Sequence, residues 1–231
     1  MKRMAVAVMV AVALGASGVA SAESYGRGQG WSVLSGETVG ANSTVFMGQV
    51  GWPGVALTLL HGATNTVDVG GRLTFNYGEE GIVSNVVPGV KIQAVFRVKL
   101  LDTGALKLGL EFAPGPLFYF YGQNRYCDAF GCYYDGGSGT EVGLALPFQL
   151  NFGLPLGSAF IANFGVWIPM WVTFGAGGGL VLPLLFGGGF EYFLNSHLAL
   201  NFNLHLGPAI YTDIGSTTLE LDAMFGIAYR F

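Results

Sequence analysis

The sequence predicts an all-β protein, a closed antiparallel transmembrane β-barrel of about ten strands, within a range of eight to twelve. Two observations favour it: the chain is very apolar but lacks a membrane helix, and apolar and polar residues alternate along most of it. The 231 residues are 52% hydrophobic and 10% charged, with a mean hydropathy of +0.52. The longest weakly polar stretch, residues 161–190, is interrupted by Pro169, Pro183 and runs of glycine. A closed sheet explains this apolarity better than helices do.

The first residues predict export. Lys2 and Arg3 precede an apolar segment, residues 4–14, that is too short to span a bilayer as a helix. Ala20-Ser21-Ala22 has the small residues of a signal-peptide cleavage site. We therefore expect residues 1–22 to be a signal peptide cleaved after Ala22, and residues 23–231 to form one barrel domain.

The alternation locates nine strands directly. In chain order they are residues 55–61, 67–76, 90–100, 106–112, 142–152, 160–172, 180–192, 198–207 and 219–231. Single-chain bacterial barrels have an even number of strands, so a tenth must lie upstream, at residues 31–39 or at Thr44–Trp52. Short connections at residues 63–65, 102–104, 156–158 and 195–196 alternate with longer ones, as periplasmic turns alternate with outer loops.

Prolines interrupt several of these strands. Pro114, Pro116, Pro169, Pro183 and Pro208 all map to the outer half, where we expect bulges as the strands leave the membrane. Pro147 lies near the middle of a strand, and the sequence offers no account of it.

The last strand carries the clearest alternation. Its apolar face ends with Phe225, Ile227, Tyr229 and Phe231, the last residue. This ending resembles the C-terminal assembly signal of Gram-negative outer-membrane β-barrel proteins, and the whole mature chain resembles that superfamily in its cleavage site and its strands. The resemblance implies a bacterial outer-membrane location, contact with outer-membrane lipid, and assembly by the barrel assembly machinery with periplasmic chaperones. We expect a monomer.

The polar faces of the strands carry balanced charges. The inward-facing cations are Arg72, Lys91, Arg97, Lys99, Lys107 and Arg230, and the acids are Asp68, Glu111, Glu141, Glu191, Glu220 and Asp222. A ring of about ten strands is only slightly wider than one that side chains fill. We therefore expect these groups, with His205, to pair in a mainly filled polar lumen.

The expected function is a structural or surface role without catalysis, cofactor or metal. One alternative is a narrow, porin-like channel for small or hydrophobic solutes, with a basic wall at Lys91, Arg97, Lys99 and Lys107 or an apolar wall near Trp167 and Trp171. Another is an outer-membrane hydrolase that uses His205 with Asp213. A net charge of −4 without a basic block argues against nucleic acid as a partner.

Cys127 and Cys132 are the only cysteines. They lie close together in the longest predicted outer loop of an exported chain, so we expect a disulfide between them. Asp128 and Asp135 could instead contribute to a calcium site, although solvated loop acids are the simpler interpretation.

Overall fold

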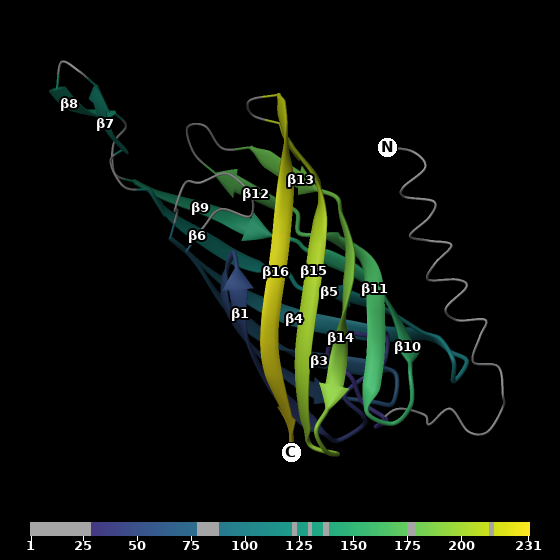
Figure 1. Ribbon diagram of the computed structural model, residues 1–231. Coiled ribbons are helices and arrows are strands. Elements are labelled where there is room, and N and C mark those ends of the chain that lie inside the picture. Colours follow the sequence, from purple (N-terminus) through teal and green to yellow (C-terminus); the bar gives the residue numbers. More distant parts are fainter. Residues whose placement is uncertain are drawn as a thin grey trace, which may run out of the picture.

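A computed structural model describes residues 29–77, 88–121, 124–128, 131–135, 139–174, 179–212 and 215–231. It confirms the predicted fold class: the strands form a closed antiparallel barrel of ten strands (Figure 1). Within these ranges no helix is long and apolar enough to cross a membrane.

Six of the ten barrel strands are continuous and four are each divided into two segments. The continuous strands are β1 (Thr44–Trp52), β2 (Gly54–Gly62), β3 (Val67–Asn76), β4 (Gly89–Asp102), β15 (Leu198–Tyr211) and β16 (Ser216–Arg230). The divided strands are β5 (Lys107–Phe112) with β6 (Gly115–Tyr121), β9 (Gly139–Ala145) with β10 (Phe148–Pro155), β11 (Phe160–Ile168) with β12 (Trp171–Phe174), and β13 (Leu180–Pro183) with β14 (Leu185–Phe193). A separate hairpin contains β7 (Asn124–Asp128) and β8 (Gly131–Asp135).

Pairing of the first strand with the last closes the ring. The β1–β16 register runs from Val45 opposite Arg230 to Trp52 opposite Ala223. The terminal strand therefore has a partner on each side at this level, which removes the exposed edge that a strand at a chain end would otherwise present. The four short turns, residues 63–66, 103–106, 156–159 and 194–197, lie at the same end as the C-terminus. We call this the turn end and the opposite end the loop end.

Of the two segments predicted as the tenth strand, one forms a strand and the other does not. Thr44–Trp52 is strand β1, as one alternative predicted. Residues 31–39 form no strand, and Trp31 and Val39 are completely buried. This segment enters the lumen, so its alternating apolar residues pack inside the barrel instead of extending its wall.

The expectation of bulges at the prolines is wrong for the divided strands. On either side of the β5/β6 break, Phe112 lies opposite Phe148 and Gly115 lies opposite Ala145. The register is therefore unchanged, and no residue is inserted at the break. The prolines interrupt the hydrogen bonding without shifting the strands, and this also accounts for Pro147, which follows β9 at the same break. Among the described strand pairs, the register shifts only between β4 and β5, between Lys99 and Leu101.

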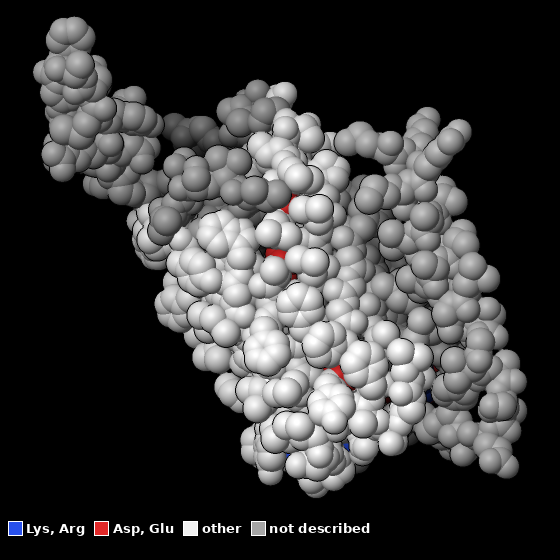
Figure 2. All heavy atoms as spheres, in the orientation of Figure 1, with Lys and Arg blue, Asp and Glu red and all other residues white. Residues whose placement is uncertain are grey.

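The outer face of the barrel is apolar. On β2, Val55, Leu57 and Leu59 are 36–51% exposed, whereas Ala56 and the intervening inward residues are buried. Figure 2 shows the described surface over β14, β15 and β16 almost without lysine, arginine, aspartate or glutamate. The charged side chains of the strands point into the lumen instead, as the alternation requires.

Candidate functional site in the plugged lumen

Residues 31–39, which we call the plug, lie in the lumen at the turn end. The plug and its flank contact three of the four short turns and the two strands that flank the fourth. Gln29 Nε2 donates to the carbonyl of Ser158, and Trp31 Nε1 donates to that of Ser196, each at 3.0 Å. Thr38 Oγ1 donates to the carbonyl of Asn65 at 3.2 Å.

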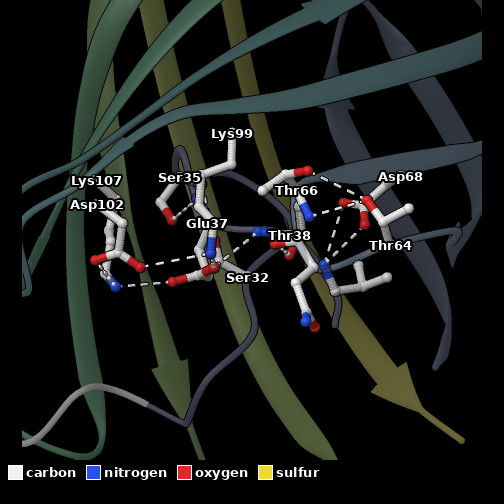
Figure 3. A network of polar contacts seen from close by, with 12 residues as sticks. Ser32, Ser35, Glu37, Thr38, Thr64, Thr66, Asp68, Lys99, Asp102 and Lys107 are labelled. Carbon is white, nitrogen blue, oxygen red and sulfur yellow. Dashed lines mark hydrogen bonds and ion pairs between the residues drawn. The ribbon is translucent and has the colours of Figure 1, made fainter. Parts of the chain in front are cut away.

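Charged groups connect the plug to β4 and β5, the strands that flank the fourth turn (Figure 3). The Glu37 carboxylate lies 2.7 Å from Lys99 Nζ and 2.9 Å from Lys107 Nζ. Both lysines also contact Asp102, Lys99 at 3.4 Å and Lys107 at 2.5 Å. Glu37 therefore binds the β4–β5 hairpin, whereas Asp102 belongs to that hairpin and contacts both lysines from within it.

Arg97 binds the plug backbone. Its guanidinium donates to the carbonyls of Ser32 at 3.1 Å, Ser35 at 3.0 Å and Glu37 at 2.7 Å. The same guanidinium lies 3.4 Å from Asp68, whose carboxylate accepts from the backbone N–H of Val39 at 3.1 Å. Arg97 and Asp68 are 4% and 0% exposed, so the plug supplies hydrogen bonds to a buried ion pair that needs them.

The plug also supplies hydrogen-bond donors to the Glu191 carboxylate. This completely buried carboxylate accepts hydrogen bonds from Ser32 Oγ and from the backbone N–H of Val33, the second at 2.8 Å. An ionised carboxylate in this position would be costly without donors. The plug is therefore part of the polar core of the barrel.

A glycine allows the close approach of the plug to the wall. A Cβ on Gly36 would collide with the backbone of Leu108 and Gly109 on β5. Residues 35–38, Ser-Gly-Glu-Thr, have the composition of a turn, which could have distinguished the plug from a strand.

Beyond the plug, toward the loop end, the lumen holds a cavity of about 100 Å³, which we call the chamber. Val33 and Leu34 of the plug are among its lining residues. Other apolar lining comes from Met47, Met224 and Trp167, and the polar lining includes Gln49, Gln149 and Asn203. Arg72 and Glu111 also line it and form an ion pair at 2.7 Å, while Glu111 lies 3.8 Å from Arg97 and so connects the chamber to the plug contacts.

His205 lies in the chamber wall. Its ring is 5.5 Å from that of Trp167, and its Nδ1 lies 3.6 Å from a carboxylate oxygen of Asp222, beyond hydrogen-bond distance. Asn203 donates to the same Asp222 oxygen at 2.8 Å. The acid beside His205 is therefore Asp222. Asp213, the acid considered for a hydrolase, lies outside the described residues.

The other residues expected in the lumen are distributed along its length. Buried Lys91 lies over the Trp171 ring, 5.5 Å from its centroid, and buried Glu220 accepts from Tyr211 Oη at 3.0 Å. Arg230 donates to Ser43 Oγ at 2.9 Å near the turn end. Glu141 lies on β9 opposite Tyr119 and is partly buried.

A second group of buried side chains fills part of the lumen nearer the loop end. It consists of Leu117, Tyr119, Ala145, Trp171 and Val181, with Tyr211 packed against it. Trp171 therefore belongs to this group, whereas Trp167 lines the chamber. The two tryptophans do not form one apolar wall of a channel.

Two further sets of predicted residues lie outside the lumen. Cys127 on β7 lies opposite Cys132 on β8 in the register of the separate hairpin, and the disulfide between them stays a prediction. The apolar residues of the terminal strand, Phe225, Ile227, Tyr229 and Phe231, are 47–69% exposed on the outer face. Their part in assembly stays a prediction.

No family model and no curated protein sequence matches this chain. Among solved structures, it is similar to the N-terminal β-barrel domain of Pseudomonas aeruginosa OprF, with 12% sequence identity and a TM-score of 0.34. The match covers 83% of this chain and 99% of that one. A similarity this distant carries no information about what this chain does.

Proposed function

We propose that this protein is an integral outer-membrane barrel with a structural or surface role, closed to solute flow by its own N-terminal plug. The observation that carries the proposal is the contact of the plug and its flank with three of the four short turns, together with the ion pairs of Glu37 and the hydrogen bonds that Arg97 donates to the plug backbone. A channel would need a continuous polar path, and in the described residues the plug occupies that path at the turn end.

The membrane location is supported by the exterior. A closed sheet satisfies its backbone hydrogen bonds internally, and its outward side chains are apolar over β2, β4 and β16. In water, such an extensive apolar surface would promote aggregation. The signal peptide and the cleavage after Ala22 remain part of the proposal.

The proposal includes no catalytic step. His205 contacts Asp222 and Trp167, and Thr74, the hydroxyl side chain in the described lining of the chamber, is not among its recorded contacts. The hydrolase alternative therefore lacks support from this geometry.

Planar-bilayer conductance of the refolded protein tests the closure. We expect the mature protein to show no steady conductance, and a variant that lacks residues 23–40 to show small, stable openings. A wide-porin conductance from the intact protein would refute the proposal. If the deleted variant is folded but silent, the side chains nearer the loop end close the lumen without the plug. Cell fractionation and N-terminal sequencing test the location and the cleavage site.

A further inference from the structure

The plug presents oxygen atoms to three cationic side chains of the barrel wall. Arg97 donates to the backbone carbonyls of Ser35 at 3.0 Å and Glu37 at 2.7 Å. Lys99 and Lys107 contact the two carboxylate oxygens of Glu37 at 2.7 Å and 2.9 Å. We call Arg97, Lys99 and Lys107 the cation cluster. In the described structure it holds a group of acceptor oxygens that carries one negative charge.

Acids of the wall neutralise Arg97 without help from the plug. Asp68 lies 3.4 Å from its guanidinium. Glu111 lies 3.8 Å from it as well, but forms a closer pair with Arg72, at 2.7 Å. Each of these two arginines therefore has one carboxylate of the wall as its nearest ionic partner.

The two lysines share a single acid of the wall. Asp102 contacts Lys99 at 3.4 Å and Lys107 at 2.5 Å, and Glu37 supplies the second negative charge. When the plug leaves, one positive charge of the lysine pair loses its counterion and Arg97 loses its carbonyl acceptors. Buried charged and polar groups without partners cost free energy. The plug-free lumen therefore favours another occupant with one negative charge and several acceptor oxygens.

The plug enters and leaves the lumen at the same end. Before it, Gln29 contacts Ser158 in a turn of the turn end. After it, the backbone N–H of Asn42 donates at 2.8 Å to the carbonyl of Gly62, where β2 reaches its turn. Because both ends of the plug lie at this end, the segment can withdraw toward the turns without threading through the barrel.

The cation cluster is close to water at the turn end. Figure 3 shows Lys99, Lys107 and Asp102 gathered around Glu37, beside the turn that joins β4 and β5. The Lys99 and Asp102 side chains are 16% and 34% exposed. A small soluble anion can therefore reach the lysines from the turn end once the plug has left.

From these contacts we propose that the cation cluster is a binding site for a small oxyanion with one negative charge, such as singly charged phosphate. Glu37 and the plug carbonyls occupy this site in the closed barrel, so a bound anion keeps the plug out of the lumen. Arginine and lysine are common partners of phosphate oxygens. A more highly charged anion is disfavoured, because Asp68 and Asp102 lie beside the site.

Hydrogen–deuterium exchange of the plug amides tests this competition. The N–H groups of Val33 and Val39 donate to Glu191 and Asp68, so they exchange when the plug leaves. The mature protein in phosphatidylcholine vesicles is measured with increasing inorganic phosphate, at a mildly acidic pH that keeps phosphate singly charged. A ligand of the plug-free state multiplies that population by 1 + [L]/Kd, so we expect a linear rise, at least about fivefold at about 50 mM.

Sodium chloride at matched ionic strength is the control for screening. Salt screens buried ion pairs much less than exposed ones, and chloride has no set of acceptor oxygens. Chloride should therefore leave the exchange of Val33 and Val39 unchanged. Equal acceleration by the two salts, or no acceleration by phosphate, would overturn the proposed site.

Variants assign the response to the cation cluster. Lys107→Gln should abolish the phosphate-dependent acceleration, although it also loosens the plug, and Lys107→Arg should retain the response because the charge is kept. Lys99 keeps both of its acidic contacts in Lys107→Gln, and heat-modifiable gel mobility checks that the barrel is folded. Lys91→Gln is the matched control, since Lys91 lies over the Trp171 ring nearer the loop end. A full response in Lys107→Gln, or none in Lys91→Gln, would contradict the assignment.

A lipid arm identifies the source of the anion. Vesicles that contain phosphatidylglycerol, without added phosphate, should leave the exchange of the plug amides unchanged, because the lysines face the lumen and not the bilayer. Acceleration by this lipid would assign the site to a lipid headgroup and overturn the soluble anion.

Conductance in the same salts separates this inference from the proposed closure, on which its effect on flow rests. We expect phosphate to produce small, steady openings of the mature protein and chloride to produce none. Faster exchange in a barrel that stays silent would support the anion site and refute closure by the plug alone. Unchanged exchange in a barrel that opens only when residues 23–40 are deleted would overturn the anion site and leave the closure intact.

Discussion

Replacement of Glu37 by Gln should release the plug without unfolding the barrel. The change removes the charge that contacts Lys99 at 2.7 Å and Lys107 at 2.9 Å. Both lysines keep a contact with Asp102, whose single negative charge then offsets one of their two positive charges. The loss is therefore smaller than for an isolated buried ion pair and corresponds to about 1.5–3 kcal/mol, the value of one hydrogen bond to a charged group.

Hydrogen–deuterium exchange measures this loss directly. The N–H groups of Val33 and Val39 donate to Glu191 and Asp68, so they exchange only when the plug leaves these carboxylates. Every 1.4 kcal/mol changes an equilibrium constant tenfold, so their exchange should become about 10- to 150-fold faster in Glu37→Gln. The amides of β2 and β3 should keep their wild-type rates, because these strands pair with each other and not with the plug.

Asp102→Asn is the matched control. It removes the other carboxylate from the same two lysines but leaves both contacts of Glu37 with them, so the amides of Val33 and Val39 should remain as protected as in the wild type. Unchanged exchange in Glu37→Gln would show that these ion pairs do not hold the plug. Equal acceleration of plug and strand amides would show that the plug cannot leave a folded barrel.

Three further changes test other parts of the structure. Gly36→Ala should also speed exchange of the plug amides, because its Cβ would collide with the β5 backbone, whereas Gly139→Ala, which meets no atom within 4 Å, should not. Deletion of Phe231, whose N–H donates to Thr44 at 2.8 Å, should reduce the heat-modifiable, folded form on gels by several-fold, while Leu194→Ala, another exposed apolar change at the turn end, should not. Mass spectrometry of the unreduced, exported protein should find Cys127 and Cys132 joined, and two free thiols would contradict the predicted disulfide.

The sequence by itself determined the strands and their faces. Alternation with a period of two is a local property, so it identified which side of β4 carries Lys91 and Arg97 and which side faces outward. It also located the charged groups in the lumen and the short turns. It did not distinguish the plug from a strand, because residues 31–39 and Thr44–Trp52 both contain regularly spaced apolar residues.

Only the tertiary structure decided what the plug and the prolines do. Ser32 and Val33 bind Glu191, which lies more than 150 residues away in the chain, and no local pattern encodes that contact. The position of Pro169 opposite Pro183 likewise depends on register, because each proline alone removes one donor, and only the alignment of two strands brings both losses to the same place. Local periodicity specifies the faces of this barrel, whereas long-range pairing determines which segment lies in its lumen and which prolines lie opposite each other.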